Sequence, residues 1–261
     1  MSTEKIQLVI PMAGRGQRFS KAGYTELKPL INIHGVPMIS IVLANLYNEL
    51  IEDVILIAQR ETMESGLLQK LVKTYPVPVH VISVDEVTEG PADSVKRARP
   101  LISDRAPLVI ANSDQYLDCD LSDFYSDLLQ TNCSGSILTM QDSDPKWSYV
   151  KIDFDGRALE VREKKVISSN ATVGIYGFKS ASFAWKLFDR MWANDDRTNQ
   201  EFYVAPSYNY LLPNENPVTV FDLGPVGSVM HGLGIPEDLE AFIESPKSWS
   251  AVEKVKSVFI S

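Results

Sequence analysis

Residues 6–19 read Ile6-Gln7-Leu8-Val9-Ile10-Pro11-Met12-Ala13-Gly14-Arg15-Gly16-Gln17-Arg18-Phe19, so an apolar run breaks into a glycine loop that carries two arginines. Lys28-Pro29-Leu30 follows nine residues later. Glycines let backbone N–H groups come close to an anion because no Cβ stands in the way. Arginine and lysine supply the countercharge. We therefore predict a strand followed by a triphosphate-binding loop.

The loop differs from two familiar phosphate-binding patterns. It lacks the Gly-Lys-Ser/Thr that ends a Walker loop. The dinucleotide fingerprint needs a third glycine where this chain has Phe19. The prediction therefore depends on the ordered set as a whole, because a single Gly-x-Gly is common in tight turns.

The ordered set Ala13-Gly14-Arg15-Gly16-x-Arg18-Phe19 with Lys28-Pro29-Leu30 resembles the signature of nucleotidylyltransferases that activate sugar 1-phosphates. It is most similar to the branch found in bacterial capsule and surface-polysaccharide clusters, although Gln17 stands where that family usually has Thr. The resemblance covers most of the chain and is densest over residues 1–35. It implies an α/β fold with a mostly parallel, Rossmann-like sheet (a GT-A-like nucleotidyltransferase fold) and a mixed, β-rich second half that binds substrate.

Composition indicates one ordinary globular domain. The 261 residues are 44% hydrophobic and 23% charged, with no low-complexity segment or Gly/Ser linker. Within one domain spanning residues 1–261, we expect residues 1–133 to bind the nucleotide. Residues 134–261 would bind the acceptor and end in the C-terminal helix.

The charge distribution is uneven. A formal net charge of −9 argues against nucleic acid or an anionic membrane as a partner. Residues 1–35 nevertheless concentrate cations beside the glycine loop: Lys5, Arg15, Arg18, Lys21 and Lys28 against Glu4 and Glu26. This arrangement indicates a local anion site.

Cellular location is inferred from what the sequence lacks. Cys119 and Cys133 form no Cys-x-x-Cys pattern and suit reduced thiols. There is no signal-peptide pattern and no apolar stretch of about 18 residues. We therefore expect a cytoplasmic protein, and the sequence leaves open whether it is a homo-oligomer.

Strands and helices are expected to alternate in the first half, which favours parallel pairing with ligands at the carboxyl ends of the strands. After the first strand, further strands are expected at Val54–Ala58, Val77–Val84 and Leu108–Ala111, and helices at Met38–Glu49, Glu61–Lys73, Ala92–Leu101 and Phe124–Leu129.

The second half reads as a mixed, strand-rich region. Strands are expected at Ser134–Met140, Tyr149–Phe154, Leu159–Arg162, Thr172–Phe178 and Pro217–Asp222, with a hairpin turn at Asp155-Gly156. Helices are expected at Ala181–Trp192, at Tyr203–Leu212 and from Pro236 onward.

Asp114 is the predicted metal ligand, because it follows the apolar strand Leu108–Ala111 and would lie at the sheet edge near the glycine loop. Mg²⁺ that binds phosphates needs only one or two protein carboxylates. Asp118-Cys119-Asp120 matches the Asp-x-Asp metal motif of many glycosyltransferases, but Asp120 also precedes a helical pattern and suits a helix cap.

The resemblance also implies residues for the second substrate. Glu163 and Lys164, in Val161-Arg162-Glu163-Lys164-Lys165, match a family segment that contacts sugar hydroxyls and the sugar phosphate. Asn170 would contact the same hydroxyls, and Gly174 would leave room for the sugar ring. The alternative is a solvated turn after a strand.

For the base, the resemblance implies a contact turn at Glu89-Gly90-Pro91, where Gly90 would let the backbone approach the base edge. Asp85 lies near a position that often reads the base. A carboxylate accepts but cannot donate, so Asp85 would suit an exocyclic amine, unless it is simply part of an exposed loop.

One departure from the family concerns a second metal aspartate near the end of the chain. Gly232 stands at that position, and His231 and Asp222 are the nearby candidates to compensate.

The favoured function is transfer of a nucleotidyl group from a nucleoside triphosphate to a sugar phosphate or similar metabolite, with Mg²⁺ as cofactor. Arg18, Lys28 and Asp114 would be the catalytic residues, and Arg15 with the amides of Ala13, Gly14 and Gly16 would hold phosphate. A metal-dependent glycosyltransferase that uses Asp118 and Asp120 is one alternative, and a non-catalytic nucleotide-binding regulator is another. The sequence names neither the base nor the acceptor.

Overall fold

The computed structural model describes residues 4–130, 132–211, 215–225, 227 and 229–259. Its central feature is a large sheet whose strands run in the order β10-β9-β11-β6-β1-β4-β5, with β8 paired to β11 and β12 paired to β8. The strands of this sheet are β1 (Ile6–Pro11), β4 (Ile51–Gln59), β5 (Val79–Val84), β6 (Leu108–Ala111), β8 (Gly135–Gln141), β9 (Tyr149–Ile152), β10 (Ala158–Arg162), β11 (Asn170–Phe178) and β12 (Val218–Pro225).

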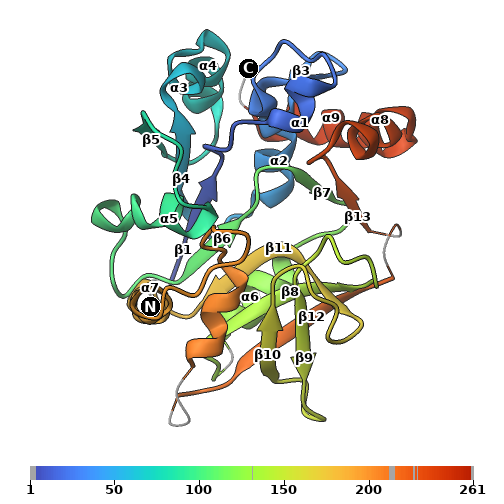
Figure 1. Ribbon diagram of the computed structural model, residues 1–261. Coiled ribbons are helices and arrows are strands. Elements are labelled where there is room, and N and C mark those ends of the chain that lie inside the picture. The colour runs from blue at the N-terminus through green and yellow to red at the C-terminus, as the bar shows by residue number, and fades with distance from the viewer. Residues whose placement is uncertain (1–3, 131, 212–214, 226, 228, 260–261) are drawn as a thin grey trace.

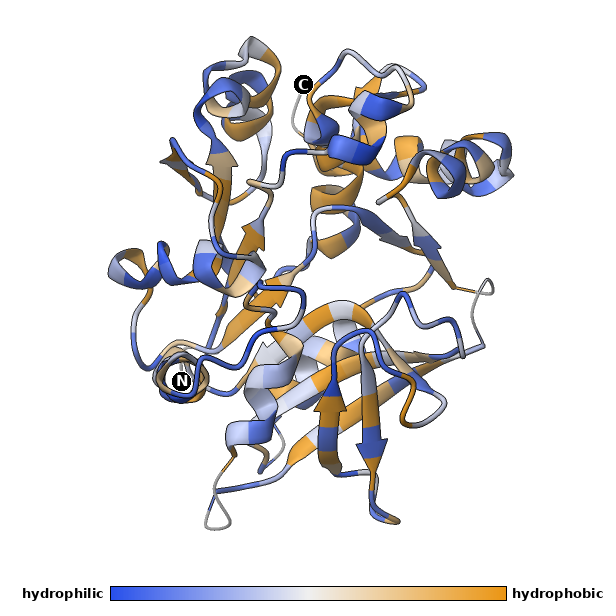
Figure 2. Ribbon diagram, viewed as in Figure 1, coloured by the Kyte–Doolittle hydropathy of each residue, from blue (hydrophilic) through white to orange (hydrophobic). Residues whose placement is uncertain are grey.

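The four strands β6, β1, β4 and β5 are parallel, which confirms the predicted α/β fold. Strands β1 and β6 are buried almost throughout, as expected for central parallel strands covered on both faces. Alternate residues of β1 enter different apolar clusters: Leu8 and Ile10 face one, and Val9 faces the other. Figure 2 shows these strands as hydrophobic segments inside the molecule.

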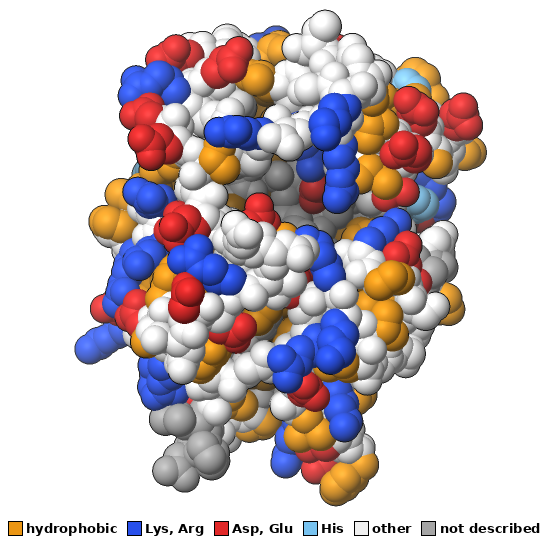
Figure 3. Space-filling view, in the orientation of Figure 1, with side chains coloured by type: hydrophobic (Ala, Val, Ile, Leu, Met, Phe, Trp, Pro, Cys, Tyr) orange, Lys and Arg blue, Asp and Glu red, His pale blue; other side chains and the backbone are white. Residues whose placement is uncertain are grey.

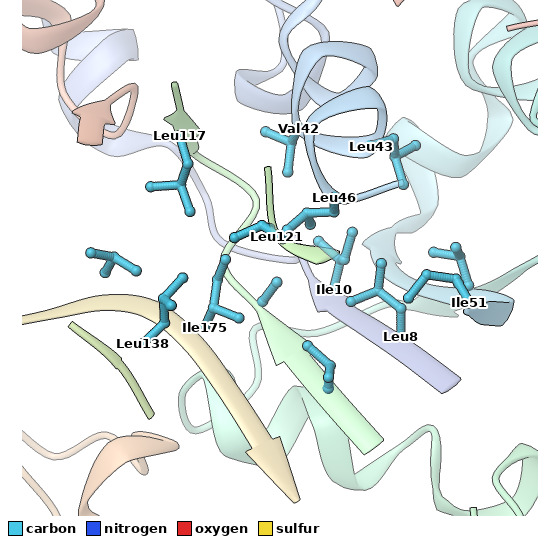
Figure 4. Close-up of a cluster of buried hydrophobic side chains, with 14 of the residues drawn as sticks. Leu8, Ile10, Val42, Leu43, Leu46, Ile51, Leu117, Leu121, Leu138 and Ile175 are labelled. Carbon is cyan, nitrogen blue, oxygen red and sulfur yellow. The ribbon is translucent and has the colours of Figure 1, made fainter. Parts of the chain in front are cut away.

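The first of these clusters joins the two halves of the chain. Leu8 and Ile10 of β1 lie beside Leu46 of helix α2 (Met38–Leu46), and Leu138 of β8 and Ile175 of β11 belong to the same cluster (Figure 4). All five side chains are almost fully buried. The second half of the chain therefore shares its hydrophobic core with the first. Burial of apolar side chains is the main favourable term in folding, so the two halves stabilise each other.

Helices lie against the sheet, and in the first half of the chain they come between successive strands in the sequence. The helices are α1 (Gln17–Lys21), α2 (Met38–Leu46), α3 (Arg60–Glu64), α4 (Gly66–Thr74), α5 (Pro91–Lys96), α6 (Ser122–Gln130), α7 (Ala181–Ala193), α8 (Pro236–Glu244) and α9 (Pro246–Val258), and the 3₁₀ helices are η1 (Lys28–Leu30), η2 (Arg99–Leu101) and η3 (Ala205–Tyr210). In Figure 1, α9 lies beside α2, far from it in sequence, and α8 packs against α9.

The helix expected at 38–49 ends at Leu46, because the backbone of Tyr47 is extended. Three other expected helices are shorter or divided, and each of these breaks has a local cause. The helix expected at 61–73 divides at Ser65, which is extended and accepts a hydrogen bond from the Leu67 N–H at the start of α4. The helix expected at 92–101 ends at Lys96 before the proline of η2. The last helix divides at Ser245, because Pro246 disfavours helical backbone at the preceding residue.

All the strands expected in the second half are present, and most of their ends differ from the predicted ends by one or two residues. Strand β11 runs antiparallel to β6 and thus attaches this half to the parallel core. The expected helix at 203–212 is the 3₁₀ helix η3 over Ala205–Tyr210, and Leu212 lies outside the described residues.

Four short strands were not predicted: β2 (Asn32–Ile33) pairs with β3 (Val36–Pro37), and β7 (Gln115–Leu117) pairs with β13 (Met230–Gly232). The second pair brings residues 230–232 next to the residues that follow β6. No helix within the described ranges is long and apolar enough to cross a membrane.

Candidate active site

A cavity of about 820 Å³ opens where β1 and β6 end. These neighbours run in parallel, with Val9 opposite Ile110, so the segments that follow them emerge at the same sheet edge. Figure 3 shows a hollow near the centre of this face with charged side chains around it. The predicted residues that line the cavity are Ala13, Gly14, Arg15, Gly16, Arg18, Lys28, Gly90, Asp114, Glu163, Lys164 and Gly174, while Asp85 and Asn170 are absent from its lining.

Gly16 shapes the cation-rich wall. It has a left-handed backbone, with φ of 59°, at the start of α1. A Cβ at Gly16 would lie 2.9 Å from the Cβ of Lys28, so glycine allows the loop to pack against the lysine stem. The side chain of Phe19, in α1, is buried. Arg15 and Arg18 are exposed to solvent and line the cavity. The loop therefore presents two unburied guanidinium groups on a fixed base.

Lys28 and Asp114 meet in the cavity. The Nζ atom of Lys28 donates a hydrogen bond to Oδ2 of Asp114 at 2.5 Å, and both side chains are partly exposed. A Cβ at Gly234 would lie 2.8 Å from the same Asp114 oxygen and 3.9 Å from Lys28 Nζ. Glycine at 234 thus leaves space around this ion pair, and the predicted phosphate cation and metal ligand are direct neighbours.

The predicted second metal position has no carboxylate of its own. Gly232 is paired with Gln115 across β13 and β7, so it lies beside the Asp114 segment. A Cβ at Gly232 would lie 3.0 Å from Oδ2 of Asp238, and Asp238 forms an ion pair with Lys146 at 3.4 Å. The space in front of Gly232 therefore holds the carboxylate of Asp238.

The two residues that were expected to compensate for Gly232 point elsewhere. Oδ2 of Asp222 accepts a hydrogen bond from Gln141 at 2.8 Å. His231 packs between Tyr116 and Phe242, and burial lowers its pKa. Neither belongs to the cavity lining. Within the described ranges, no group of three or more His, Cys, Asp or Glu side chains is arranged to hold a metal.

Asp118 and Asp120 lie outside the main cavity. Asp118 accepts an ion-pair contact from Lys247. Asp120 accepts hydrogen bonds from the side chain and backbone N–H of Ser122, the first residue of α6, and these bonds lower the pKa of Asp120. Both line a separate cavity of about 730 Å³ that also contains Lys254. The Asp-x-Asp motif therefore lines a different cavity from the one that the glycine loop lines.

The opposite wall of the main cavity carries Glu163 and Lys164. Glu163 is half-buried, and burial raises its pKa, although Ser148 donates a hydrogen bond to its carboxylate. Lys164 has a left-handed backbone, with φ of 53°, just after β10 ends. Its Nζ atom donates to the Tyr203 hydroxyl at 2.6 Å. These contacts hold one acid and one cation on this wall.

Gly174 lines the cavity and packs closely against two protein side chains. Its φ is 77°, and a Cβ there would lie 2.2 Å from Nδ2 of Asn112 and 2.8 Å from Oε1 of Gln115. Glycine thus makes room for two protein side chains, and its contact with a sugar ring stays a prediction. Asn170 is buried beside β9, where its Nδ2 donates to the carbonyl of Val150 at 3.3 Å.

Of the two residues expected to contact the base, one lines the cavity and the other does not. Asp85 is exposed and forms an ion pair with Arg60 at 2.6 Å, outside the cavity. Gly90 lines the cavity, and with φ of 117° its missing side chain leaves room for backbone: a Cβ would lie 2.6 Å from the carbonyl oxygen of Phe202. Its glycine is therefore explained by the packing of residues 201–202.

Sequence reasoning missed several lining residues: Gln115, Lys146, Ser148, Glu201, Tyr203 and Asp238. Thr172 and Tyr176 also line the cavity, and they lie on the same strand as the predicted Gly174. Gln115 is 2% exposed, and among the described residues its Nε2 has no hydrogen-bond partner. Its position next to Asp114 was the one available signal. Ser148 and Tyr203 carried no such signal in the sequence, because serine and tyrosine occur in strands and loops of every kind.

A family model described as "Nucleotidyl transferase" matches residues 8–205. The chain therefore belongs to the nucleotidyl transferase family and is a nucleotidyltransferase. The comparison with curated protein sequences gives no significant match.

Solved structures with the same fold include two enzymes. A nucleoside-diphosphate-sugar pyrophosphorylase from Vibrio cholerae RC9 is 20% identical, with a TM-score of 0.75, over 91% of this chain and 100% of that one. The inositol-1-phosphate CTP transferase from T. maritima is 15% identical, with a TM-score of 0.73, over 97% of each chain. At these identities the likeness establishes the fold.

Proposed function

We propose that this enzyme transfers a nucleotidyl group from a nucleoside triphosphate to a phosphorylated sugar or similar polyhydroxyl metabolite in the cytoplasm, for surface-polysaccharide or capsule precursors. The observation that supports this most is the shared cavity. Arg15, Arg18 and Lys28 come to it from one wall and Glu163 with Lys164 from the other. Two anionic substrates can therefore be held with their phosphates facing each other.

The reaction needs no covalent enzyme intermediate. A phosphate oxygen of the acceptor attacks the α-phosphorus of the triphosphate, a new P–O bond forms, and the bond to the pyrophosphate oxygen breaks. Catalysis then consists of positioning and charge neutralisation. Arg18, with Arg15 and the loop amides, stabilises the departing pyrophosphate, and Lys28 neutralises charge near the α-phosphate. Lys164 orients the acceptor phosphate.

Asp114 is the residue that would hold Mg²⁺. Its carboxylate lines the cavity and pairs with the ammonium group of Lys28. This ion pair supports the proposal that a positive ion binds beside Asp114. One protein carboxylate is enough when phosphate oxygens complete the coordination shell. When bound, the ion would neutralise and orient the phosphates.

The acceptor wall favours a polyhydroxyl partner. Ser148, Thr172 and Tyr176 line the cavity beside Glu163, and the hydroxyls of Thr172 and Tyr176 lie 3.0 Å apart. Protein hydroxyls can donate to and accept from the hydroxyls of a sugar or cyclitol, and a carboxylate can accept from them.

The test is release of pyrophosphate across four nucleoside triphosphates, each combined with a panel of phosphorylated sugars, polyols and aminoalcohols in the presence of Mg²⁺. We expect release with one triphosphate and one phosphorylated polyol. Triphosphate binding without release across the whole panel would favour the regulator. Release of a nucleoside diphosphate from a nucleotide sugar would favour the glycosyltransferase, although Asp118 and Asp120 lie outside this cavity.

A further inference from the structure

The segment Glu201–Val204 belongs to the second wall of the cavity and also contacts the first half of the chain. On one side it is attached to the expected base-contact turn, since Phe202 accepts a hydrogen bond from the Ala92 N–H at 3.0 Å and donates one to the Glu89 carbonyl at 2.7 Å. Gly90 has no side chain to interfere with this contact. Arg197, just before the segment, forms an ion pair with Glu89 at 3.0 Å. The segment is thus held against the first half of the chain.

On its other side this segment holds Lys164. The Tyr203 hydroxyl accepts a hydrogen bond from Lys164 Nζ at 2.6 Å and donates one to Oε2 of Glu201 at 2.6 Å. The lysine ammonium also lies 4.5 Å from the centre of the Tyr203 ring. Lysine side chains carry large rotamer entropy, so two contacts to one tyrosine restrict where this charge can go.

Tyr203 also lies within electrostatic reach of the first wall. Burial raises the pKa of its hydroxyl, as do the hydrogen bond from it to Glu201 and the charge of Glu163, while the guanidinium of Arg18 acts in the opposite direction. Tyr203 lines the cavity together with Arg18 and Lys164. The phenol therefore contacts the cation expected to hold the acceptor and shares the cavity with the cation expected to hold pyrophosphate.

We propose that Tyr203 is a positioning residue, which fixes the Lys164 ammonium at the point where the acceptor phosphate binds and ties that point to the Glu89–Pro91 turn. This inference rests on the proposed function and adds a residue to it. Its physical basis is that a preorganised cation stabilises developing charge better than a mobile one. Glu201 supports the same geometry by accepting the tyrosine proton in a hydrogen bond.

The first test uses the free protein and needs no turnover. Lysine acetylation with an N-hydroxysulfosuccinimide ester, followed by mass spectrometry, gives the rate at Lys164 relative to its exposed neighbour Lys165. Y203F should raise this ratio by about fivefold, the equivalent of one lost hydrogen bond. E201Q should raise it less. Y210F is the matched control, because it removes a tyrosine hydrogen bond to Asp196 outside the cavity and should leave the ratio unchanged.

A second measurement uses inorganic phosphate as the probe. Phosphate should protect Lys164 from acetylation in the wild type, and Y203F should raise the half-protecting concentration at least about threefold. An unchanged Lys164 to Lys165 ratio in both Y203F and E201Q, or equal phosphate protection in wild type and Y203F, would overturn the inference.

Kinetics then separate the inference from the proposed function. With the acceptor found in the panel, Y203F should raise the acceptor KM or lower kcat by about fivefold. The triphosphate Kd should change by less than about threefold. A loss confined to triphosphate binding would contradict a role through Lys164. Absence of pyrophosphate release in the wild type would end the proposed function, while the two acetylation measurements would still decide whether Tyr203 holds Lys164.

Discussion

The two walls of the cavity are built in different ways. The first wall comes from one short stretch of chain, residues 13–28, and presents exposed guanidinium groups on a loop that Gly16 shapes and Phe19 anchors. The second wall collects single residues from separate segments, among them Ser148 and Tyr203. Its polar groups are mostly bonded to one another, through the contacts of Glu163, Lys164 and Tyr203.

This difference indicates a division of tasks. An exposed set of cations suits a flexible, highly charged triphosphate, because charge alone supplies much of the interaction. A wall of paired hydroxyl and carboxylate groups suits discrimination among acceptors, since an acceptor that leaves a buried polar group unpaired is penalised. Single substitutions on each wall can test whether the two walls act separately.

The largest effect is expected on the first wall. R18A and K28A should each lower turnover by at least about 10²-fold, the scale for losing one preorganised charge stabiliser, without unfolding the protein. Steady-state kinetics and circular dichroism measure both. K21A is the matched control, since Lys21 is an exposed cation of the same helix outside the cavity lining. Near wild-type rates in both R18A and K28A would rule out nucleotidyl transfer through these two cations.

The next effect concerns the metal. D114N should weaken Mg²⁺-dependent triphosphate binding by at least about tenfold, because loss of even an outer partner of a metal site commonly costs that much. D118N should not, since Asp118 pairs with Lys247 and faces another cavity. Calorimetric titration with and without Mg²⁺ measures the difference. If D118N proves to be the crippling change, the glycosyltransferase alternative moves ahead.

A smaller and more selective effect is expected on the second wall. K164A should raise the acceptor KM or depress kcat, because a residue that contacts one substrate alters the use of that substrate. Triphosphate affinity without acceptor should change by less than about threefold, or roughly 0.6 kcal/mol. K165A serves as control. A large loss of triphosphate binding in K164A would show that the two walls are not separate.

The smallest effect is a pH dependence of stability. Burial raises the pKa of Glu163 above its ordinary 4.5, so the folded protein retains this proton to a higher pH than the unfolded chain. The stability that this proton provides is complete below the unfolded pKa and is lost as pH rises through the folded pKa. The melting temperature of E163Q minus that of wild type should therefore increase from about pH 4 to pH 7. A difference that stays constant or falls would contradict a buried, desolvated carboxylate.

Parts of the site could be predicted because their causes are local. The glycine loop and Lys28 carry their chemistry within one short segment, and Asp114 follows from the rule that parallel strands end at a common edge. The helix breaks were missed where single residues decided them, at Ser65 and before Pro246.

Other assignments depended on contacts that sequence spacing does not show. Asp85 and Asn170 lie near cavity-lining residues in the chain, yet Arg60 holds the first and Val150 the second outside the cavity. Gly174 and Gly90 are explained by the close approach of Asn112 and of the Phe202 backbone. A glycine in a sequence shows that space is needed without showing what fills it.

By itself, the sequence determined the α/β class, and it placed the cation-bearing glycine loop and the carboxylate of Asp114 together, because periodic hydrophobicity and a contiguous motif act over a few residues. Only the tertiary structure decided which distant side chains complete the second wall of the cavity, and which carboxylate fills the space before Gly232. Those choices depend on the pairing of β13 with β7 and on the position of residues 201–204. Both are fixed by long-range packing that no local pattern records.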